Sequence, residues 1–170
     1  MIDNDGQVHV KVKVRLATVA DASACSEVLC ASIRELCSSD HQDDEQVIAD
    51  WLANKTPENL ARWIQSPEAE IYVADVEASV VGVGGTSGSE IALNYVAPNY
   101  KGRGVSTAIL KTLERILFDQ GIRRAQLTST ATAHEFYRRA GWIDSGEPVE
   151  SLGVLGFPME KALVLDTLGD

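Results

Sequence analysis

Three short strand-like runs follow one another in the middle of the chain, and they are the feature that most restricts its fold. They cover residues 70–75, 80–85 and 90–96, and only a turn near Glu77 and the segment 86–89 separate them. Connections this short join strands that lie side by side in opposite directions. The sequence therefore predicts an antiparallel three-stranded meander around which the other elements are arranged.

The residues before this meander predict one strand and three helices. Residues 8–16 alternate apolar and polar side chains at period two, as a half-buried strand does. Thr18 and Asp21 then have the spacing of a capping box. The apolar face of the helix that follows consists of Cys25, Leu29, Ile33 and Leu36. Residues 47–52 form a second helical pattern, and Pro57 opens a third at its first turn.

After the meander the pattern alternates between helix and strand. The first helix presents the apolar face Ile109, Leu113, Ile116 and Leu117. Residues 125–128 then form a strand and residues 133–140 a short helix, at whose start Thr132 and Glu135 have capping-box spacing. The tail over residues 154–165 adds one or two strands. This mixture predicts an α/β (α+β) protein.

Length and composition favour one domain over residues 8–165. The chain has 170 residues, of which 45% are hydrophobic, and this is enough to build one sizeable core. Its formal net charge of −10 disfavours nucleic acids and anionic lipids as partners. Because no segment approaches the roughly 20 apolar residues that span a bilayer, we expect a soluble, cytoplasmic protein. The oligomeric state stays open, a homodimer included.

Other polar and sulfur-bearing side chains form no evident metal site. Cys25, Cys30 and Cys37 lie in one helical region without a close pair, so they are interpreted as small buried or half-buried residues. The acidic run between the first helices contains Asp40, Asp43, Asp44 and Glu45. It is either a solvated loop or a surface that attracts a cationic amine. Trp51 is interpreted as a core residue, with a place in an acceptor site as the alternative.

A glycine-rich turn joins the last strand of the meander to the following helix. Residues 95–106 read Tyr-Val-Ala-Pro-Asn-Tyr-Lys-Gly-Arg-Gly-Val-Ser. Gly102 and Gly104 let the backbone approach a ligand, and the helix start offers unpaired N–H groups, which together suit a pyrophosphate. The alternative is an ordinary tight turn before a helix. A dinucleotide fingerprint would need a third glycine, and no GxxxxGK motif followed by Ser or Thr occurs.

Two segments resemble the signatures of the GNAT superfamily of N-acetyltransferases. Residues 101–106 resemble its pyrophosphate loop, with Lys101 at the first position and Ser106 at the last. Residues 128–142 resemble its second signature, with Thr130 where many members have Asn. The resemblance implies a mixed, mostly antiparallel sheet of about six or seven strands flanked by about four helices and splayed where acetyl-CoA enters.

The resemblance also implies a reaction, in which an acetyl group moves from acetyl-CoA directly to a primary amine without a metal. Tyr137 would be the acid that protonates the departing thiolate. Glu90, eleven residues before Lys101, stands where histone-modifying members carry a catalytic glutamate base. The residues implied in binding acetyl-CoA are Tyr95, Val96, Lys101, Gly102, Arg103, Gly104, Val105, Ser106 and Thr130.

Each role has a plainer alternative that the sequence leaves open. The backbone N–H of Val96 is the expected donor to the thioester oxygen. Tyr137 could instead be a packed aromatic residue, and Glu90 a solvated charge at a strand end. Glu135 is interpreted as a helix cap rather than a second base. The whole chain could also be a catalytically silent acyl-CoA-binding sensor that keeps the fold, and thiol release would separate it from an enzyme.

Overall fold

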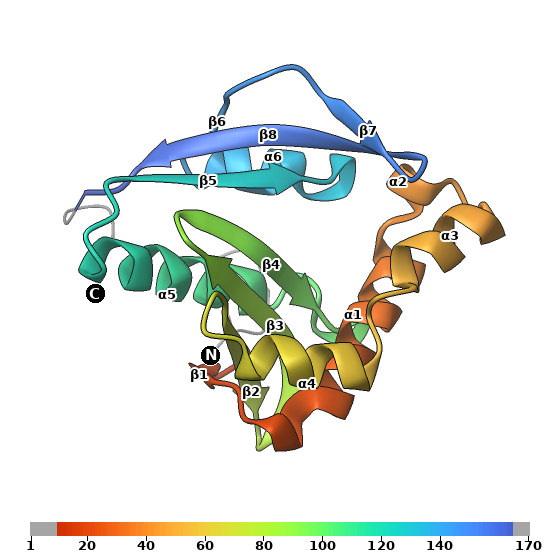
Figure 1. Ribbon diagram of the computed structural model, residues 1–170, viewed down its shortest axis with the longest axis horizontal. Coiled ribbons are helices and arrows are strands. Elements are labelled where there is room, and N and C mark those ends of the chain that lie inside the picture. The colour runs from red at the N-terminus through yellow and green to blue at the C-terminus, as the bar shows by residue number, and fades with distance from the viewer. Residues whose placement is uncertain (1–9, 165–170) are drawn as a thin grey trace.

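The computed structural model describes residues 10–164, which form one mixed sheet with helices packed on it (Figure 1). The strand order is β1-β2-β3-β4-β5-β8-β6, and β7 pairs with β8. The strands are β1 (Lys13–Leu16), β2 (Glu70–Val76), β3 (Ser79–Ser87), β4 (Glu90–Val96), β5 (Arg124–Ser129), β6 (Ile143–Asp144), β7 (Val149–Ser151) and β8 (Val154–Ala162). The α-helices are α1 (Ala22–Leu36), α2 (Ser38–His41), α3 (Glu45–Leu52), α4 (Pro57–Gln65), α5 (Val105–Asp119) and α6 (Ala131–Arg139).

The predicted meander is confirmed, because β2 pairs antiparallel with β3 and β3 pairs antiparallel with β4. The predicted mixed, mostly antiparallel fold class is also confirmed. The short strands β6 and β7 and the single-turn helix α2 raise the element counts above the expected ones. The strand expected over residues 8–16 starts outside the described residues, and its paired part is Lys13–Leu16.

Local signals account for the starts of the first helices. Thr18 and Asp21 form the predicted capping box, in which the Thr18 backbone N–H donates to the Asp21 carboxylate at 2.7 Å. Thr56 caps α4, whose first turn contains Pro57, by accepting from the Asn59 N–H at 3.2 Å. These elements begin where the sequence predicts, because a cap depends only on residues three positions apart.

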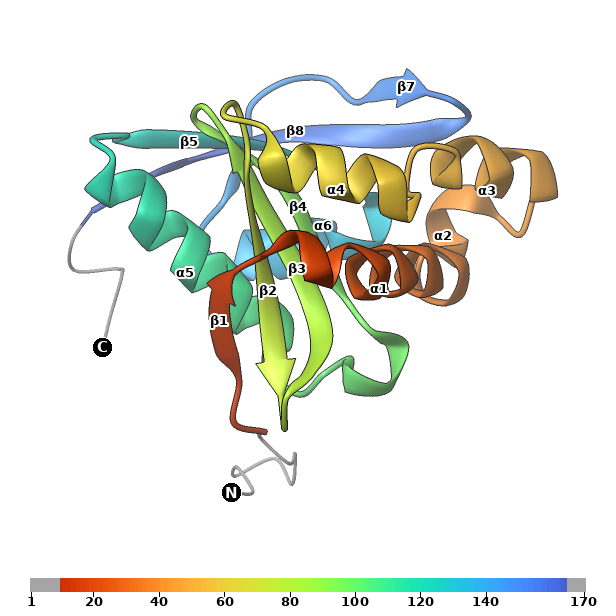
Figure 2. The same ribbon diagram turned by 60° about the horizontal axis from the view of Figure 1, so that its bottom comes forward.

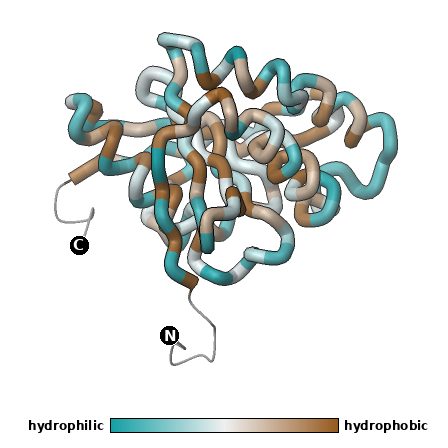
Figure 3. The backbone as a smooth tube through the Cα atoms, turned by 90° about the horizontal axis from the view of Figure 1, so that it is seen from below, coloured by the Kyte–Doolittle hydropathy of each residue, from teal (hydrophilic) through white to brown (hydrophobic). Residues whose placement is uncertain are grey.

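Helix α5 packs close to the middle of the sheet, because two of the glycines of β3 face it. A Cβ atom at Gly82 would stand 2.7 Å from Ile109 Cδ1, and one at Gly84 would stand 2.5 Å from Ile109 Cγ2. The helix therefore packs directly on the strand backbone, with Ile109 and Leu113 fully buried. Seen from below, hydrophobic stretches concentrate in the central strands, and the outlying loops are mainly hydrophilic (Figure 3).

The sheet opens between β4 and β5, its one parallel pair among the described strands. Glu90 and Gln126 are the only residues in register between them, and the Gln126 N–H also donates to the Ser89 carbonyl at 3.0 Å. Beyond this point the two strands run apart (Figures 1 and 2). The sheet therefore has a closed end at Glu90 and an open end near Val96 and Ser129. No helix within residues 10–164 combines the length and apolar character that crossing a membrane requires.

A buried ionic network joins α5 to the strand β8. The Glu114 side chain is 3% exposed and accepts from the Lys161 ammonium at 3.1 Å and from the Trp142 indole N–H at 2.9 Å. Lys161 also donates to the Ala140 carbonyl at 2.7 Å. Since a buried carboxylate is stable only when its oxygens are hydrogen-bonded, this network holds α5 to the ends of α6 and β8.

Replacing Trp142 by Phe should lower the free energy of unfolding by about 2 kcal/mol, because it removes a hydrogen bond to a buried charge. Urea denaturation measures this change. The matched control is Trp63→Phe on α4, a partly buried indole whose ring faces the Lys55 ammonium at 5.9 Å. Equal costs for the two variants would show that the indole hydrogen bond to Glu114 adds nothing to stability.

Candidate functional site

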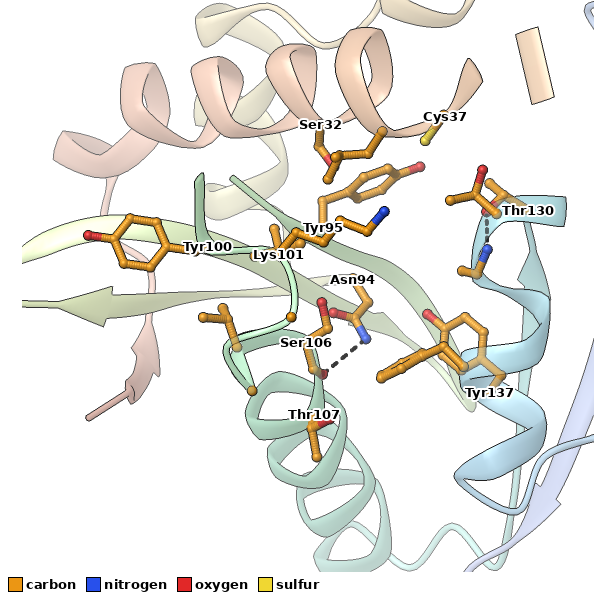
Figure 4. A pocket seen from close by; sticks show the side chains of 18 of the residues that line it. Ser32, Cys37, Asn94, Tyr95, Tyr100, Lys101, Ser106, Thr107, Thr130 and Tyr137 are labelled. Atoms are coloured by element: carbon orange, nitrogen blue, oxygen red, sulfur yellow. Dashed lines mark hydrogen bonds between the residues drawn. The ribbon is translucent and has the colours of Figure 1, made fainter. Parts of the chain in front are cut away.

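A cavity of about 500 Å³ occupies the open end of the wedge between β4 and β5 (Figure 4). Four parts of the chain form its walls: the end of α1, the strand β4, the loop before α5 with the first turn of that helix, and one side of α6. Ser32 and Cys37 come from the first wall, and Asn94 and Tyr95 from the second. The divergence of two strands thus brings together residues that are far apart in the sequence.

The loop before α5 presents backbone rather than side chains to this cavity. Gly102 and Gly104 both have left-handed backbones, with φ of 74° and 88°. Gly104 is the N-cap of α5, and it has no side chain that could accept the N–H groups of the first turn. Those N–H groups and the positive end of the helix dipole are therefore available to an anion. Lys101, Val105 and Ser106 line the same wall.

Asn94 lies opposite this helix start and was missed by sequence reasoning. Its Nδ2 group donates to the Ser106 carbonyl at 3.4 Å, tying β4 to the beginning of α5. Its Oδ1 atom is buried and has no hydrogen-bond partner among residues 10–164. A buried acceptor without a partner is costly in a folded protein, so a ligand that donates a hydrogen bond would be stabilised here. No sequence signal marks Asn94, since a strand asparagine is unremarkable without its neighbours.

Tyr137 projects from α6 into the cavity, where its hydroxyl faces Asn94 (Figure 4). Burial raises the pKa of this phenol to about 12, and a hydrogen bond from Asn94 opposes the shift only in part. Phe136 and Trp142 pack edge-on against its ring, with centroids 5.1 Å and 6.1 Å away. Tyr137 is therefore held in place as a neutral proton donor at ordinary pH.

The backbone of Val96 also points into the opening. The Ala97 N–H donates to the Val81 carbonyl at 2.8 Å, in the direction of β3. Because successive N–H groups of an extended chain point to opposite edges, the Val96 N–H is directed away from β3 and toward the diverging β5. A backbone donor in that direction suits an oxygen on which negative charge develops.

Most of the residues predicted to form the site line this one cavity. They are Tyr95, Val96, Lys101, Gly102, Gly104, Val105, Ser106, Thr130 and Tyr137. Arg103 does not belong to its lining, and its guanidinium lies over the Tyr100 ring at 5.3 Å. The cation on the opposite wall is Arg139 of α6, which sequence reasoning did not single out.

Glu90 does not join these residues. It is exposed at the closed end of the wedge, six residues along β4 from Val96 and thus roughly 20 Å away at the usual rise of a strand. It lines none of the cavities that border Tyr95. Its position therefore does not support the interpretation of Glu90 as the base and agrees with that of a charge at a strand end.

Cys37 and Tyr95 complete the wall nearest α1. Burial raises the pKa of the Cys37 thiol to about 12, so this sulfur is a neutral thiol and a poor nucleophile at ordinary pH. The three cysteines are free, with Cys25 and Cys37 buried and Cys30 half-buried, as predicted. Burial also raises the pKa of Tyr95, whose hydroxyl accepts a hydrogen bond from Trp51.

Asp40, the first residue of the acidic run, belongs neither to a solvated loop nor to a surface that attracts an amine. Asp40 is 9% exposed, and its carboxylate accepts from the Ala131 N–H at 2.6 Å and from the Thr132 N–H at 3.3 Å. It therefore stabilises the start of α6 and is neither solvated nor available to a substrate. Asp44 caps α3 by accepting from the N–H groups of Gln46 and Val47. Asp43, Asp44 and Glu45 are all exposed.

The start of α6 also corrects the predicted capping box. Thr130 is the N-cap and accepts from the Ala133 N–H at 3.1 Å, while the Thr132 hydroxyl donates to Asp40. Glu135 is exposed and faces Arg139 at 3.8 Å, so the interpretation of Glu135 as a helix cap is wrong. Asp40, a carboxylate from another helix, caps α6 together with Thr130, which spacing alone could not reveal.

The role of Asp40 predicts a difference between two variants that each remove one negative charge. Asp40→Asn should lower the free energy of unfolding by about 1 to 2 kcal/mol, because a charged partner of the α6 start is lost. Asp43→Asn should change it by less than about 0.5 kcal/mol, since Asp43 is 83% exposed and Asn tolerates its left-handed backbone. Urea denaturation of both variants checks this prediction. Equal free energies of unfolding for the two variants would show that Asp40 does not stabilise the start of α6.

The cavity fits the coenzyme A portion of an acyl donor. A long anionic ligand would find the backbone N–H groups of the α5 start at one end, with Lys101 and Arg139 as cations on either side. The unpartnered Asn94 oxygen could accept from an amide N–H of its arm. The Tyr137 hydroxyl lies next to Asn94, where a thiol end would need a proton donor.

Comparisons with known proteins agree with this geometry. The sequence profile of the family described as Acetyltransferase (GNAT) domain matches residues 37–163. An acetyltransferase from Sodalis glossinidius (strain morsitans), SG1711, is 33% identical over 98 residues, which cover 51% of this chain and 69% of that protein.

Solved structures share the fold over nearly the whole chain. A GCN5-related N-acetyltransferase from Rhodopseudomonas palustris superposes with a TM-score of 0.82 at 23% identity, covering 92% of this chain and 99% of that one. The PaiA N-acetyltransferase from Thermoplasma acidophilum, solved in complex with coenzyme A, gives a TM-score of 0.76 at 20% identity, covering 89% of this chain and 99% of that one. At these identities the structures establish the shared fold.

Proposed function

Since the chain belongs to the GNAT acetyltransferase family, we propose that it transfers an acetyl group from acetyl-CoA directly to a primary amine. The observation that carries this proposal is one cavity that joins an anion-binding helix start to a buried phenol. The loop at Gly102 and Gly104 forms one wall of that cavity, and Tyr137 forms another. The coenzyme A complex of the Thermoplasma acidophilum structure supports the choice of donor.

Binding of the donor depends on the backbone. The N–H groups at the start of α5 hold the pyrophosphate, with Lys101 and Arg139 as nearby cations. The Asn94 oxygen accepts from the arm that leads to the thioester, and Thr130 borders the same channel. Because backbone donors need no reorganisation, this site is preorganised for the donor.

In the transfer step, the nitrogen of the amine forms a bond to the acetyl carbon and the bond from that carbon to sulfur breaks. The Val96 N–H stabilises the negative charge that develops on the thioester oxygen. Tyr137 donates its proton to the departing thiolate, and its pKa of about 12 keeps this proton available at ordinary pH. Cys37 stays a neutral thiol, which favours direct transfer over an acyl-enzyme.

The proton of the amine has no carboxylate to accept it within the described lining of this cavity. Glu90 lies at the closed end of the wedge, and Asp40 caps α6. The ammonium form therefore loses one proton to water before attack. The nitrogen loses a second proton as the amide forms, and this proton replaces the one that Tyr137 gives to the thiolate. Turnover at low amine concentration rises with pH as the fraction of free amine increases.

Release of free thiol from acetyl-CoA across a panel of primary amines tests this function. The test includes the affinity for coenzyme A, measured separately by calorimetry. Amine-dependent thiol release, with the acetylated amine identified by mass spectrometry, is the expected result. Tight coenzyme A binding without turnover of any amine would instead identify an acyl-CoA sensor with the same fold.

A further inference from the structure

A second cavity of about 450 Å³ lies on the other side of Tyr95, under the hairpin of β7 and β8. Trp51 of α3 forms its opposite wall, and α3 and the hairpin lie side by side in both ribbon views (Figures 1 and 2). The hairpin tip rests on this helix, because a Cβ at Gly153 would stand 3.0 Å from a Val47 methyl carbon. Cavities of this size hold small organic molecules.

The described walls of this cavity are mainly apolar, and none of their side chains is charged. Its apolar lining includes Trp51, Val149, Leu152, Val154, Leu155 and Pro158. Its polar lining consists of hydroxyl groups, chiefly those of Thr128, Ser129 and Thr130 at the end of β5. None of the described lining residues is Asp, Glu, Lys or Arg. In β7, Val149 and Ser151 face the cavity, and Glu150 between them faces the opposite side, as alternation along a strand requires.

The second cavity adjoins the first, because Tyr95 and Thr130 line both. A molecule seated under the hairpin would therefore lie beside the donor channel, with Tyr95 and Thr130 at the boundary between the two cavities. Three of its apolar side chains are left largely open to solvent: Val149 is 60% exposed, Leu152 64% and Leu155 49%. Apolar side chains exposed around a cavity are typical of a site that a ligand covers.

From these observations we infer that the acceptor is a small primary amine whose remaining skeleton is apolar and uncharged. This inference rests on the proposed function and names the substrate class of the same site. The skeleton fills the cavity between Trp51 and the hairpin, and the hydroxyl groups at the end of β5 receive the amine. A second cationic group would lose its hydration against apolar walls without gaining a carboxylate partner. An acceptor with a second positive charge is therefore disfavoured, and the acidic run, interpreted as a surface that attracts a cationic amine, adds no carboxylate to the described lining of this cavity.

Two amines with the same number of heavy atoms separate these alternatives. Hexylamine and 1,5-diaminopentane differ only in a terminal methyl group against a terminal ammonium group. Their affinities for the protein saturated with coenzyme A are measured by calorimetry, and their kcat/KM values by thiol release from acetyl-CoA. We expect hexylamine to bind at least about 100-fold more tightly, since the cavity desolvates the second charge. From propylamine to hexylamine, each added methylene should raise affinity about fourfold, the equivalent of 0.8 kcal/mol per buried CH₂.

A variant of the cavity wall provides an independent test. Leu152 has a left-handed backbone with φ of 52°, a conformation that Asp and Asn adopt readily, so both substitutions should keep the fold. Leu152→Asp introduces a carboxylate beside the acceptor, and Leu152→Asn is its uncharged control. We expect Leu152→Asp to reduce the preference for hexylamine at least tenfold relative to Leu152→Asn. Affinity for coenzyme A should be unchanged in both, because Leu152 does not line the donor cavity.

The outcomes distinguish this inference from the proposed function. Equal or tighter binding of 1,5-diaminopentane, with turnover intact, would overturn the apolar acceptor and leave the acetyltransferase standing. Failure of every amine to turn over, together with tight and selective hexylamine binding, would overturn the enzyme and support the apolar site. An acceptor found only among peptides or polyamines would also contradict the inference.

Discussion

Tyr137→Phe should lower kcat by about 100-fold while leaving the affinity for coenzyme A nearly unchanged. The substitution keeps the aromatic ring, which packs between Phe136 and Trp142, and removes only the proton donor. Loss of a general acid typically costs 10²- to 10⁴-fold in rate. Steady-state thiol release and calorimetric titration with coenzyme A measure the two quantities.

The pH profile gives this prediction its sharpest form. Because burial raises the Tyr137 pKa above its ordinary value to about 12, the phenol keeps its proton to higher pH than an exposed tyrosine would. The parent enzyme should therefore show no loss of rate from phenol ionisation below about pH 11. The variant should keep the rise with pH that comes from the amine and run below the parent throughout.

Tyr72→Phe on β2 is the matched control. Its hydroxyl donates to Glu70 at 2.5 Å, and the residue lines none of the cavities that border Tyr95. Its rate should stay within about twofold of the parent. Activity of Tyr137→Phe equal to that of the parent from pH 6 to 10 would show that Tyr137 is not the acid that protonates the thiolate.

Gly104→Val should abolish detectable binding of acetyl-CoA, a loss of at least about 100-fold in affinity. A side chain at this position would stand between the pyrophosphate and the N–H groups of the α5 start. Since Gly104 has φ of 88°, valine would also strain the backbone by about 1 to 3 kcal/mol. Calorimetry with coenzyme A measures the affinity, and thermal denaturation shows whether the variant is folded.

A second variant distinguishes two effects of the valine: a side chain that blocks the loop, and a strained backbone that destabilises the fold. Gly104→Asn introduces a side chain that adopts the left-handed conformation at lower cost, so the fold should be kept while binding is still lost. Gly88→Asn is its control, because Gly88 also has a left-handed φ of 57° and a Cβ there would meet no atom within 4 Å. Parent-like coenzyme A affinity in folded Gly104→Asn would exclude this loop as the pyrophosphate site.

Much of the proposed donor site could be predicted from the sequence because it is local. The glycine turn, the helix that follows it and the aromatic residues of α6 are each defined by spacings of a few residues. The strand and helix periods also predicted the meander and the order of the elements. A resemblance at two segments was then enough to bring Lys101, Gly104 and Tyr137 into one expected site.

Residues that depend on long-range contacts could not be predicted in this way. Asn94 carries no motif, and its importance comes from Ser106 and Tyr137 on two other elements. Glu90 has the expected spacing from Lys101, but the place where β4 meets β5 puts it at the closed end of the wedge. Trp51 fits a helical period equally well as a core residue or as a cavity wall, and the structure places it at the second cavity.

The sequence by itself determined the backbone elements and the glycine loop proposed to bind an anion, since these depend on side-chain period and on the left-handed freedom of glycine. Only the tertiary structure decided what the acidic run does. Asp40 meets Ala131 across 91 positions of the chain, and burial beside a helix start turns its carboxylate from a surface charge into a cap. The tertiary structure likewise formed the cavity proposed for the acceptor, because residues from α3, β5 and the β7–β8 hairpin come together only where the sheet has opened between β4 and β5.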